Sequence, residues 1–307
     1  MPPALSIITP CLNRAGMITA AIESVMAQGL DDYEHIIIDG GSTDGTLEIL
    51  GRYPHLKVIS EPDKGIYDAL NKGLRMARGR IIGHLNSDDA YEPGCLSVVM
   101  QTFVDAPDLD SVCGGALLED ERGVVASYTA PQNKALTFAS ALLGSPIINA
   151  RFFTRAFYDR CGEYDLAYPL TADRDFLVRS VLAGCRARPL EIMVYRYRRH
   201  DGSWTFNKSN KAARSLSLEY RTMARCWLAK PGIPASLAAA CRQLYGEAVA
   251  RLAWTSLRDR QPMAAATHLF YDEGAVSLAP AAAAAAAVAR WSFRSSEAEA
   301  PACRQRS

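Results

Sequence analysis

The chain has 307 residues, enough to bury a substantial core, which favours one large domain with an appendage or two modest domains. Its 34 basic and 33 acidic side chains give a formal net charge of +1, which excludes an overall attraction to nucleic acid. The eight cysteines are scattered without a CxxC pair, so we expect free thiols rather than a zinc site or a disulfide framework. The amino-terminal sequence resembles neither a secretory signal nor a membrane span, and we therefore expect a cytoplasmic location.

Strands and helices are predicted to alternate through the first 90 residues. Apolar, β-branched runs predict strands at 5–10, 34–38, 56–61 and 80–85. Helical spacing of apolar residues predicts helices within 15–28, near 45–52 and at 66–78. This alternation predicts an α/β fold with a doubly wound, mostly parallel, Rossmann-like sheet. Ligands of such sheets bind beyond the carboxyl ends of the strands, where Thr9, Asp39 and Asp88 fall.

The second half has a less regular pattern. It predicts a strand near 111–118, helices that end at Gly162 and Gly184, and a strand within 188–200. From about residue 216 the pattern is helical, with interruptions at 230–234 and Pro262. We therefore expect a main domain at 1–215, with halves at 1–95 and 96–215, and a helical, Ala- and Arg-rich extension with a frayed tail at 216–307.

Two glycine-containing motifs follow predicted strands. In "IIIDGGSTDGT", Asp39 leaves a strand and could present a carboxylate to a ligand N–H, although turn glycines and a helix cap at Asp44 would look the same. In "EPDKGIYDALNKG", Lys64 could contact a polar ring or a phosphate, and Asp68 lies one turn later; a solvated loop is the alternative. The dinucleotide pattern GxGxxG and the Walker pattern are both absent from the first motif, which argues against a simple NAD or P-loop site.

The segment "NSDD" carries the adjacent carboxylates Asp88 and Asp89 at the end of the predicted strand 80–85. Such a pair can hold a divalent cation that shares its remaining ligands with water and with the phosphates of a substrate. Without a cation, their repulsion would raise the pKa of one carboxyl group. The alternative is a helix N-cap followed by a turn.

The motifs "TPCLNR", "IDGGSTDGT", "EPDKGIYDALNKG" and "LNSDD", in this order, resemble the nucleotide-sugar-binding half of family 2 glycosyltransferases, which have the GT-A fold. The resemblance is closest to bacterial members that build exopolysaccharide, capsule or O-antigen chains. It is dense over residues 4–95 and looser to about 205. It implies a nucleotide-sugar site that includes Thr9, Pro10, Asn13, Asp39, Lys64, Asp68 and Asp88, with Asp89 on Mn²⁺ or Mg²⁺.

A second acidic motif, "TADRDFLVR" at 171–179, matches the segment of the family that supplies the catalytic base. The resemblance implies that Asp173 is this base, with Asp175 as the alternative, although Ala172 replaces the usual glutamate. Inverting transfer needs one carboxylate to take a proton from the acceptor and one cation to stabilise the leaving diphosphate. Two acids in the first turn could instead serve only the helix dipole.

The basic segment "RYRRHDGSWT" at 196–205 lies near the point where the family often places a residue that meets the metal or the pyrophosphate. His200 is therefore an additional candidate for the metal, and Arg198 and Arg199 are candidates for the diphosphate or the acceptor. A surface loop is the alternative for the arginines. Asn149 stands where similar members often have His, which leaves the acceptor contact open.

The sequence thus predicts an inverting, metal-dependent transferase that moves a sugar from a nucleotide sugar, most simply a UDP-sugar, to a glycan or lipid-linked glycan in bacterial surface polysaccharide synthesis. The extension could place it peripherally on the inner face of the plasma membrane. The alternatives are a sugar nucleotidyltransferase and a non-catalytic sugar-nucleotide-binding scaffold. The intact Asp89 and Asp173 argue against the scaffold.

Overall fold

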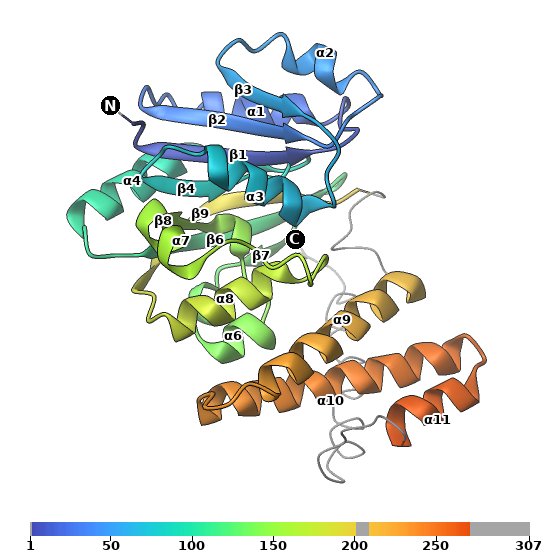
Figure 1. Cartoon of the computed structure of the whole chain (residues 1–307). Coiled ribbons are helices and arrows are strands. Elements are labelled where there is room, and N and C mark those ends of the chain that lie inside the picture. The colour runs from blue at the N-terminus through green and yellow to red at the C-terminus, as the bar shows by residue number, and fades with distance from the viewer. Residues whose placement is uncertain (1, 201–208, 271–307) are drawn as a thin grey trace, which may run out of the picture. The chain divides into compact units, whose positions relative to one another are not determined.

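The computed structural model describes residues 2–200 and 209–270, and the chain divides into two compact units, Met1–Ser203 and Trp204–Ser307 (Figure 1). The boundary expected between residues 215 and 216 falls inside helix α9 (Asn210–Leu228), a short distance after this division. The candidate site residues of the sequence analysis all belong to the first unit.

The first unit is built on one sheet, which has nine strands in the described part of the chain. The strands are β1 (Leu5–Cys11), β2 (Tyr33–Asp39), β3 (Leu56–Ser60), β4 (Ile81–His84), β5 (Ala90–Tyr91), β6 (Ser111–Asp120), β7 (Gly123–Tyr128), β8 (Arg151–Thr154) and β9 (Ala187–Arg198). Their spatial order is β3-β2-β1-β4-β8-β6-β9-β5, and β7 pairs with β6. The helices are α1 (Ile18–Met26), α2 (Thr46–Leu50), α3 (Ile66–Met76), α4 (Cys95–Asp105), α5 (Pro131–Lys134), α6 (Phe138–Leu142), α7 (Arg155–Cys161) and α8 (Ala172–Leu182), with a 3₁₀ turn at Ile148–Ala150.

The first four long strands confirm the predicted parallel arrangement. Strand β1 is buried along its whole length and pairs in parallel with both β2 and β4, while β3 pairs in parallel with β2. In this register Cys11 lies opposite Asp39, and Asp39 lies opposite Ser60. The motifs that follow β1, β2, β3 and β4 therefore meet at one edge of the sheet, as the sequence predicted.

The second half of the sheet is mixed. Strand β8 pairs antiparallel with β4 and β6, and β9 pairs in parallel with β6 and antiparallel with β5. Strands β5, β7 and β8 were not predicted from the sequence, and two of them, β5 and β8, have only two and four residues. Through its pairing with β5, the long strand β9 lies next to the chain that follows the "NSDD" segment.

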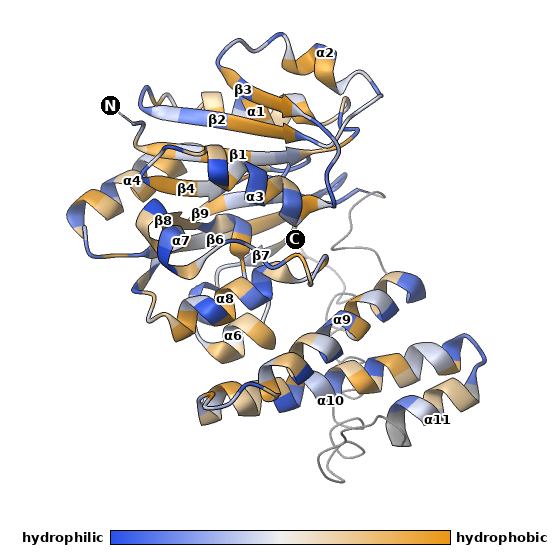
Figure 2. Ribbon diagram, viewed as in Figure 1, coloured by the Kyte–Doolittle hydropathy of each residue, from blue (hydrophilic) through white to orange (hydrophobic). Residues whose placement is uncertain are grey.

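Helices cover the sheet, and apolar residues concentrate on the central strands and on the helix faces that pack against them (Figure 2). Helix α3 lies unusually close to β1 at Gly73, where an added Cβ would be 2.3 Å from Cγ2 of Ile8. The missing side chain thus fixes the distance between α3 and the sheet, which matters for the residues at the other end of this helix.

The second unit is helical, as expected, with α9, α10 (Ala235–Arg258) and α11 (Pro262–Phe270) in the part that the structure describes. Apolar side chains such as Met223, Trp227 and Leu244 are buried. Across residues 2–200 and 209–270, none of the helices combines the length and the apolar character needed to cross a bilayer.

Candidate active site

Asp39 organises the turn after β2. Its Oδ2 accepts hydrogen bonds from the backbone N–H of Gly41 and Ser42 and from the Ser60 hydroxyl, at 3.1, 2.9 and 2.7 Å. Its Oδ1 accepts a further bond from the Ser42 hydroxyl. Burial alone would raise the pKa of Asp39, but these hydrogen bonds outweigh it and hold the pKa below its usual value. Asp39 is therefore a fixed carboxylate at the edge of the sheet.

Asn13 joins the loop after β1 to the loop after β2. Its backbone N–H donates to the Ser42 hydroxyl at 2.7 Å, and its side-chain oxygen accepts from the Thr43 N–H at 2.9 Å. Asn13 has a φ of 52°, in the left-handed region that Asn tolerates better than most residues. Thr9 and Pro10 lie deeper, buried within β1, and the Thr9 hydroxyl hydrogen-bonds His35 at 2.9 Å. These two residues support the site from inside the sheet.

The "DKG" turn enters α3 next to the glycine turn after β2. Gly65, with a φ of 115°, precedes the helix in a conformation that L side chains rarely adopt. The Asp68 carboxylate accepts from the Lys64 N–H at 3.0 Å, so it caps the turn. The Asp63 carboxylate packs against Gly40, where an added Cβ would be 2.6 Å from Oδ2 of Asp63. The two loops are therefore in direct contact, and the Lys64 side chain extends from an exposed position.

Asp89 is 4% exposed and its carboxylate accepts three hydrogen bonds. Oδ2 accepts from the Tyr195 hydroxyl at 2.8 Å and from the Asn86 amide at 3.0 Å, while Oδ1 accepts from the Arg198 backbone N–H at 2.9 Å. Burial, reinforced by the adjacent Asp88, raises the pKa of Asp89 to about 7 even though these donors oppose the shift. The predicted electrostatic conflict of the two carboxylates is therefore present.

Asp88 faces a different set of partners from Asp89. Its Oδ2 lies 2.9 Å from Nε2 of His200 and 4.0 Å from Nε of Arg14. Asp88, Arg198 and His200 line a cavity of about 310 Å³ together with residues around α1. The other residues of this lining are Gly16, Met17, Thr19, Ala20 and Glu23. We call this space the strand-end cavity, because it lies where β4 and β9 end.

Asp173 lies in the first turn of α8 and its Oδ1 accepts a hydrogen bond of 2.9 Å from the Tyr67 hydroxyl. Burial raises the pKa of Asp173, although the Arg174 charge and the Tyr67 hydroxyl oppose this shift. Asp175, the alternative base, is 3% exposed and forms an ion pair with Arg179 at 2.8 Å. The Arg179 guanidinium also donates to two backbone carbonyls. The Asp175 carboxylate is therefore tied to a cation that holds the backbone, whereas the Asp173 carboxylate accepts from the Tyr67 hydroxyl.

The remaining predicted residues, Arg198, Arg199 and Asn149, contact different parts of the first unit. The Arg198 side chain lines the strand-end cavity, whereas Arg199 donates its backbone N–H to the Glu119 carbonyl at 2.8 Å and has a guanidinium nitrogen 4.0 Å from Asp120. Asn149 lies in the 3₁₀ turn before β8. Of the basic segment, the structure therefore brings Arg198 and His200 to the carboxylates, while the Arg199 side chain lies towards Asp120.

Several residues that hold the predicted carboxylates are not evident from the sequence. Tyr195 and Asn86 bind Asp89, Tyr67 binds Asp173, and Ser60 binds Asp39. Asn86 and Tyr67 belong to the motifs "LNSDD" and "EPDKGIYDALNKG", so their positions in the sequence could have identified them as candidate site residues. Tyr195 gave no signal of its own, since it is one of three aromatic or apolar residues in the strand segment "VYRY".

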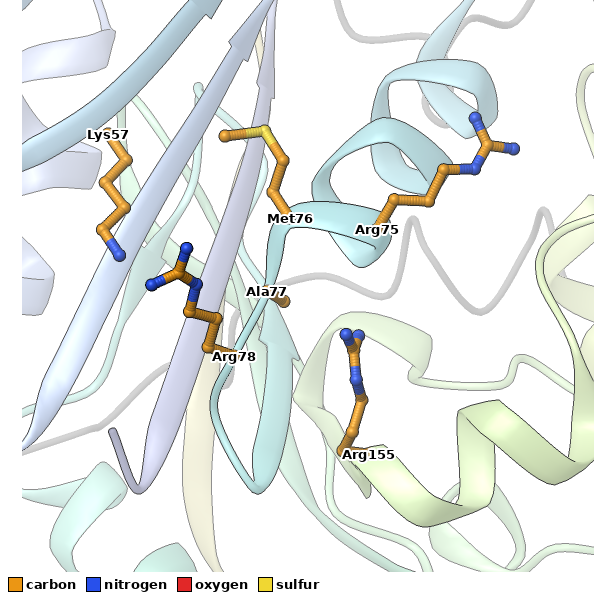
Figure 3. A pocket seen from close by; sticks show the side chains of 6 residues that line it. All are labelled: Lys57, Arg75, Met76, Ala77, Arg78 and Arg155. Atoms are coloured by element: carbon orange, nitrogen blue, oxygen red, sulfur yellow. The ribbon is translucent and has the colours of Figure 1, made fainter. Parts of the chain in front are cut away.

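A second cavity, of about 510 Å³, lies at the opposite edge of the parallel strands (Figure 3). It is lined by Lys57, Arg75, Met76, Ala77, Arg78 and Arg155. Three of its four cations already have partners: Lys57 pairs with Glu34, Arg75 with Glu163, and Arg155 donates to a backbone carbonyl. Because the chemistry-bearing motifs lie at the carboxyl ends of the strands, we do not identify this larger cavity as the active site.

The carboxylate doublet fits a hard divalent cation. The described residues contain no group of three or more His, Cys, Asp or Glu side chains arranged to hold a metal by themselves. Asp89 nevertheless keeps acceptor capacity, since a carboxylate offers about four lone-pair sites and three are used. A cation beside the doublet would also favour its ionised form. Carboxylate oxygens are the ligands that Mg²⁺ and Mn²⁺ prefer.

Comparisons with known proteins agree with this arrangement. The family described as "Glycosyl transferase family 2" matches residues 6–158. A relative from Mycobacterium tuberculosis, the "PGL/p-HBAD biosynthesis glycosyltransferase", is 30% identical over 200 residues, which is 63% of this chain and 73% of the relative. The "Chondroitin synthase" of Escherichia coli is 38% identical over 115 residues, 36% of this chain and 16% of that protein.

Two solved structures are similar in fold. S. aureus TarS 1-349 in complex with UDP-GlcNAc has a TM-score of 0.61 at 20% identity, over 95% of this chain and 80% of the other. The mannosyltransferase PcManGT of Pyrobaculum calidifontis, in complex with GDP-Man and Mn²⁺, has a TM-score of 0.60 at 19% identity, over 96% and 82%. The architecture is therefore that of GT-A glycosyltransferases, and the expectation of that fold is confirmed. The chain belongs to glycosyltransferase family 2.

Proposed function

We propose that this glycosyltransferase is inverting and depends on a divalent metal, and that it moves a sugar from a nucleotide sugar, in the first place a UDP-sugar, to a glycan or lipid-linked glycan. The observation that carries the proposal is the position of the Asp88–Asp89 doublet. It lies at the carboxyl edge of the parallel strands and beside the strand-end cavity, in the same unit as Asp173. A polar edge of this kind, together with a cation held by carboxylates, can bind the diphosphate of an anionic donor.

The donor would bind along the edge formed by the first four parallel strands. We assign Asp39 and Asn13 to the base, over the buried Thr9 and Pro10 that support them. Lys64 would reach the base or the phosphates from the turn that Asp68 caps. Asp88 would hold the ribose, and Arg198 the diphosphate, because both side chains line the cavity.

Asp89 would hold the metal, Mn²⁺ or Mg²⁺, whose other ligands would be diphosphate oxygens and water. When bound, the cation supplies electrostatic stabilisation of the charge on the leaving diphosphate. His200 is an additional candidate ligand, but its 2.9 Å contact is with Asp88, so we expect it to orient that carboxylate. We propose that Arg199 contacts the acceptor.

Asp173 would act as the general base. Inversion requires the acceptor hydroxyl to attack the anomeric carbon on the face opposite the leaving diphosphate. The Asp173 carboxylate would take the hydroxyl proton as the new C–O bond forms and the bond to the diphosphate breaks. Burial keeps the pKa of Asp173 above that of an ordinary aspartate, which makes the carboxylate a stronger base.

The relatives support the substrate class. TarS and PcManGT were solved with UDP-GlcNAc and with GDP-Man and Mn²⁺, and the curated relatives include chondroitin and hyaluronan synthases as well as the mycobacterial "PGL/p-HBAD biosynthesis glycosyltransferase". These relatives support our proposal that the enzyme acts in bacterial surface polysaccharide synthesis. We propose a cytoplasmic location, with peripheral attachment to the inner face of the plasma membrane through the second unit.

The test is an assay of nucleoside diphosphate release. The full chain would be incubated with UDP-GlcNAc, UDP-glucose, UDP-galactose or GDP-mannose, with Mn²⁺, Mg²⁺ or EDTA. We expect metal-dependent release from a UDP-sugar that Asp89→Ala and Asp173→Asn abolish, while the exposed-residue control Asp31→Asn does not. With an acceptor, NMR of the product should show the inverted anomeric configuration.

The other outcomes identify the alternatives. Formation of pyrophosphate from a sugar phosphate and a nucleoside triphosphate would indicate a sugar nucleotidyltransferase, and binding without turnover would indicate a scaffold. Full activity of Asp173→Asn with donor and acceptor would overturn the assignment of the base. Full activity in EDTA would overturn the role of the metal.

A further inference from the structure

We propose that Tyr67 is a positioning residue for Asp173, and that through it helix α3 sets the position of the base relative to the donor-binding turn. The inference rests on the proposed role of Asp173. Its starting observation is the 2.9 Å hydrogen bond from the Tyr67 hydroxyl to Oδ1 of Asp173. The same hydroxyl lies 3.5 Å from the Leu170 carbonyl, and since it has a single proton the shorter contact takes it.

One face of α3 contacts residues 163–173, which lead into α8, through three side chains, and Tyr67 is the first of them. One turn later, the Asn71 side chain donates to the Tyr164 carbonyl at 2.8 Å and accepts from the Tyr164 N–H at 2.9 Å. After another turn, Arg75 binds the Glu163 carboxylate through two nitrogens. Positions 67, 71 and 75 follow the i, i+4, i+8 spacing of a single helix face. This face of α3 therefore holds the chain from residue 163 to Asp173 at both ends.

Helix α3 is itself held firmly against the sheet. Gly73 permits a contact with Ile8 that any side chain would prevent. At its amino end, the helix follows the "DKG" turn, in which Asp68 caps the backbone of Lys64. Tyr67 thus stands between the proposed donor contacts and the proposed base, on an element whose distance from β1 is fixed by packing.

The Tyr67 ring has a packing role that can be separated from the role of its hydroxyl. The ring centroid lies 5.3 Å from that of Tyr164, which in turn packs on Phe176 of α8 at 5.1 Å. The substitution Tyr67→Phe keeps these ring contacts and removes only the hydroxyl. Tyr158→Phe is the matched control, because its hydroxyl lies in the same aromatic cluster, 3.5 Å from that of Tyr164, whereas the hydroxyl bound to Asp173 among the described residues is that of Tyr67.

Among the described residues, the charged and titratable groups around Asp173 come from three elements and from the segment that precedes α8. Arg174 is on α8 itself, Tyr67 is on α3, Tyr197 is on β9, and Tyr164 lies in the segment that α3 holds. Burial keeps Tyr164 and Tyr197 neutral, since their pKa values lie well above the usual value for tyrosine. Among the described side chains, Arg174 and the Tyr67 hydroxyl stabilise the ionised form of Asp173, and backbone N–H groups of Arg174 and Asp173 add to this effect. Loss of the hydroxyl should therefore raise the pKa of this carboxyl group further.

The kinetic test compares Tyr67→Phe with Tyr158→Phe, using the sugar nucleotide from which the full chain releases diphosphate fastest. For Tyr67→Phe we expect kcat to fall about ten-fold, as for the loss of one hydrogen bond to a charged group. We expect an unchanged KM for the donor and an acid limb of the kcat profile displaced to higher pH. Tyr158→Phe should leave all three quantities as in the wild type.

A second test does not need turnover. The full chain would be labelled with ¹³C at the aspartate carboxyl carbons and titrated by NMR, and the resonance missing from Asp173→Asn would identify Asp173. Its titration should move to higher pH in Tyr67→Phe and stay in place in Tyr158→Phe. An unchanged titration in Tyr67→Phe would overturn the inference, as would equal shifts in both variants, which would indicate a general loosening of the aromatic cluster.

The two proposals fail in different ways. If Asp173→Asn retains full activity, the role of Asp173 as base is wrong whatever Tyr67→Phe does. If Asp173→Asn is inactive while Tyr67→Phe keeps both the wild-type kcat profile and the wild-type titration, the base stands and only the positioning role of Tyr67 is wrong.

Discussion

The Tyr195 hydroxyl donates a hydrogen bond of 2.8 Å to Oδ2 of Asp89. The same hydroxyl oxygen accepts the Asn86 backbone N–H at 3.0 Å. A residue of β9 thus satisfies both a backbone donor and a carboxylate acceptor of the "NSDD" turn, although the two segments are separated by more than 100 positions in the chain. Tyr195 and Asp89 are both buried, so neither side chain can readily exchange their hydrogen bond for one to water.

Tyr195→Phe should therefore destabilise the protein. The substitution leaves the Asn86 N–H and one acceptor site of Asp89 without a partner, at a cost of about 1–3 kcal/mol in the free energy of unfolding. Urea denaturation followed by circular dichroism would measure it. The control Tyr53→Phe removes a hydroxyl that contacts Glu23 at the surface, at 3.3 Å, and should stay within about 0.5 kcal/mol of the wild type. Equal stabilities of the two variants would refute the prediction.

Divalent metal should stabilise the wild type through Asp89. A ligand that binds only the folded state adds about 2.7 kcal/mol when its concentration is 100 times its dissociation constant. Mn²⁺ together with UDP should therefore raise the melting temperature of the wild type and of Asp31→Asn, but have much less effect on Asp89→Asn. EDTA should reverse the increase. A full response of Asp89→Asn would show that the metal binds elsewhere.

Asp173→Asn should be at least as stable as the wild type near neutral pH. The raised pKa of Asp173 means that the folded state binds the proton more tightly than the unfolded state does, for which 3.8 is the reference. Stability of the wild type therefore falls as pH rises from 3.8 through the folded-state pKa, and the variant escapes this loss. Urea denaturation near pH 7 should give a larger free energy of unfolding for Asp173→Asn than for the wild type, and this difference should disappear below pH 3.8.

The activity of the wild type should have the opposite dependence on pH, because the base must be ionised. Its kcat should rise with pH as Asp173 loses its proton, at a pH above the range of an ordinary aspartate. A stability difference between wild type and Asp173→Asn that does not change with pH would contradict this account of the carboxyl group.

Gly73→Ala should weaken both the fold and catalysis. The new Cβ would lie 2.3 Å from Cγ2 of Ile8, so α3 must move away from β1, at a cost of about 1–3 kcal/mol. The matched control is Gly51→Ala, where the Cβ would be at an ordinary 3.5 Å from its nearest neighbour. Thermal unfolding should separate the two variants, and kcat should fall for Gly73→Ala because Tyr67 moves with the helix. Wild-type stability of Gly73→Ala would contradict the packing argument.

The parallel half of the fold could be predicted because its signals are local. Continuous apolar runs form β1, β2 and β4, and the polar residues that follow them meet at one edge, since parallel strands share their direction. Strand β8 could not be predicted because it is short and leads directly into α7, so that Phe153 and Thr154 fall within the segment 153–162 that predicts the helix ending at Gly162.

The carboxylates of the candidate site could be predicted from the sequence, but the residues that bind each of them could not. Asp88 and Asp89 carry the same charge in adjacent positions, yet the structure gives His200 to the first and Tyr195 to the second. This division depends on the register of β9 against β5, in which Tyr91 lies opposite Tyr195. Pairing between two strands so far apart in sequence leaves no local pattern that one sequence can reveal.

The bond from the Arg198 N–H to Asp89 spans 109 positions of the chain. A ribosome adds about 5–20 residues per second, so roughly 5–20 s pass between the synthesis of the carboxylate and that of its partner. During this interval the nascent chain carries the "NSDD" segment without the strand that encloses it. Because Asp89 is the proposed metal ligand, we expect catalysis to begin only after β9 has been synthesised and has paired.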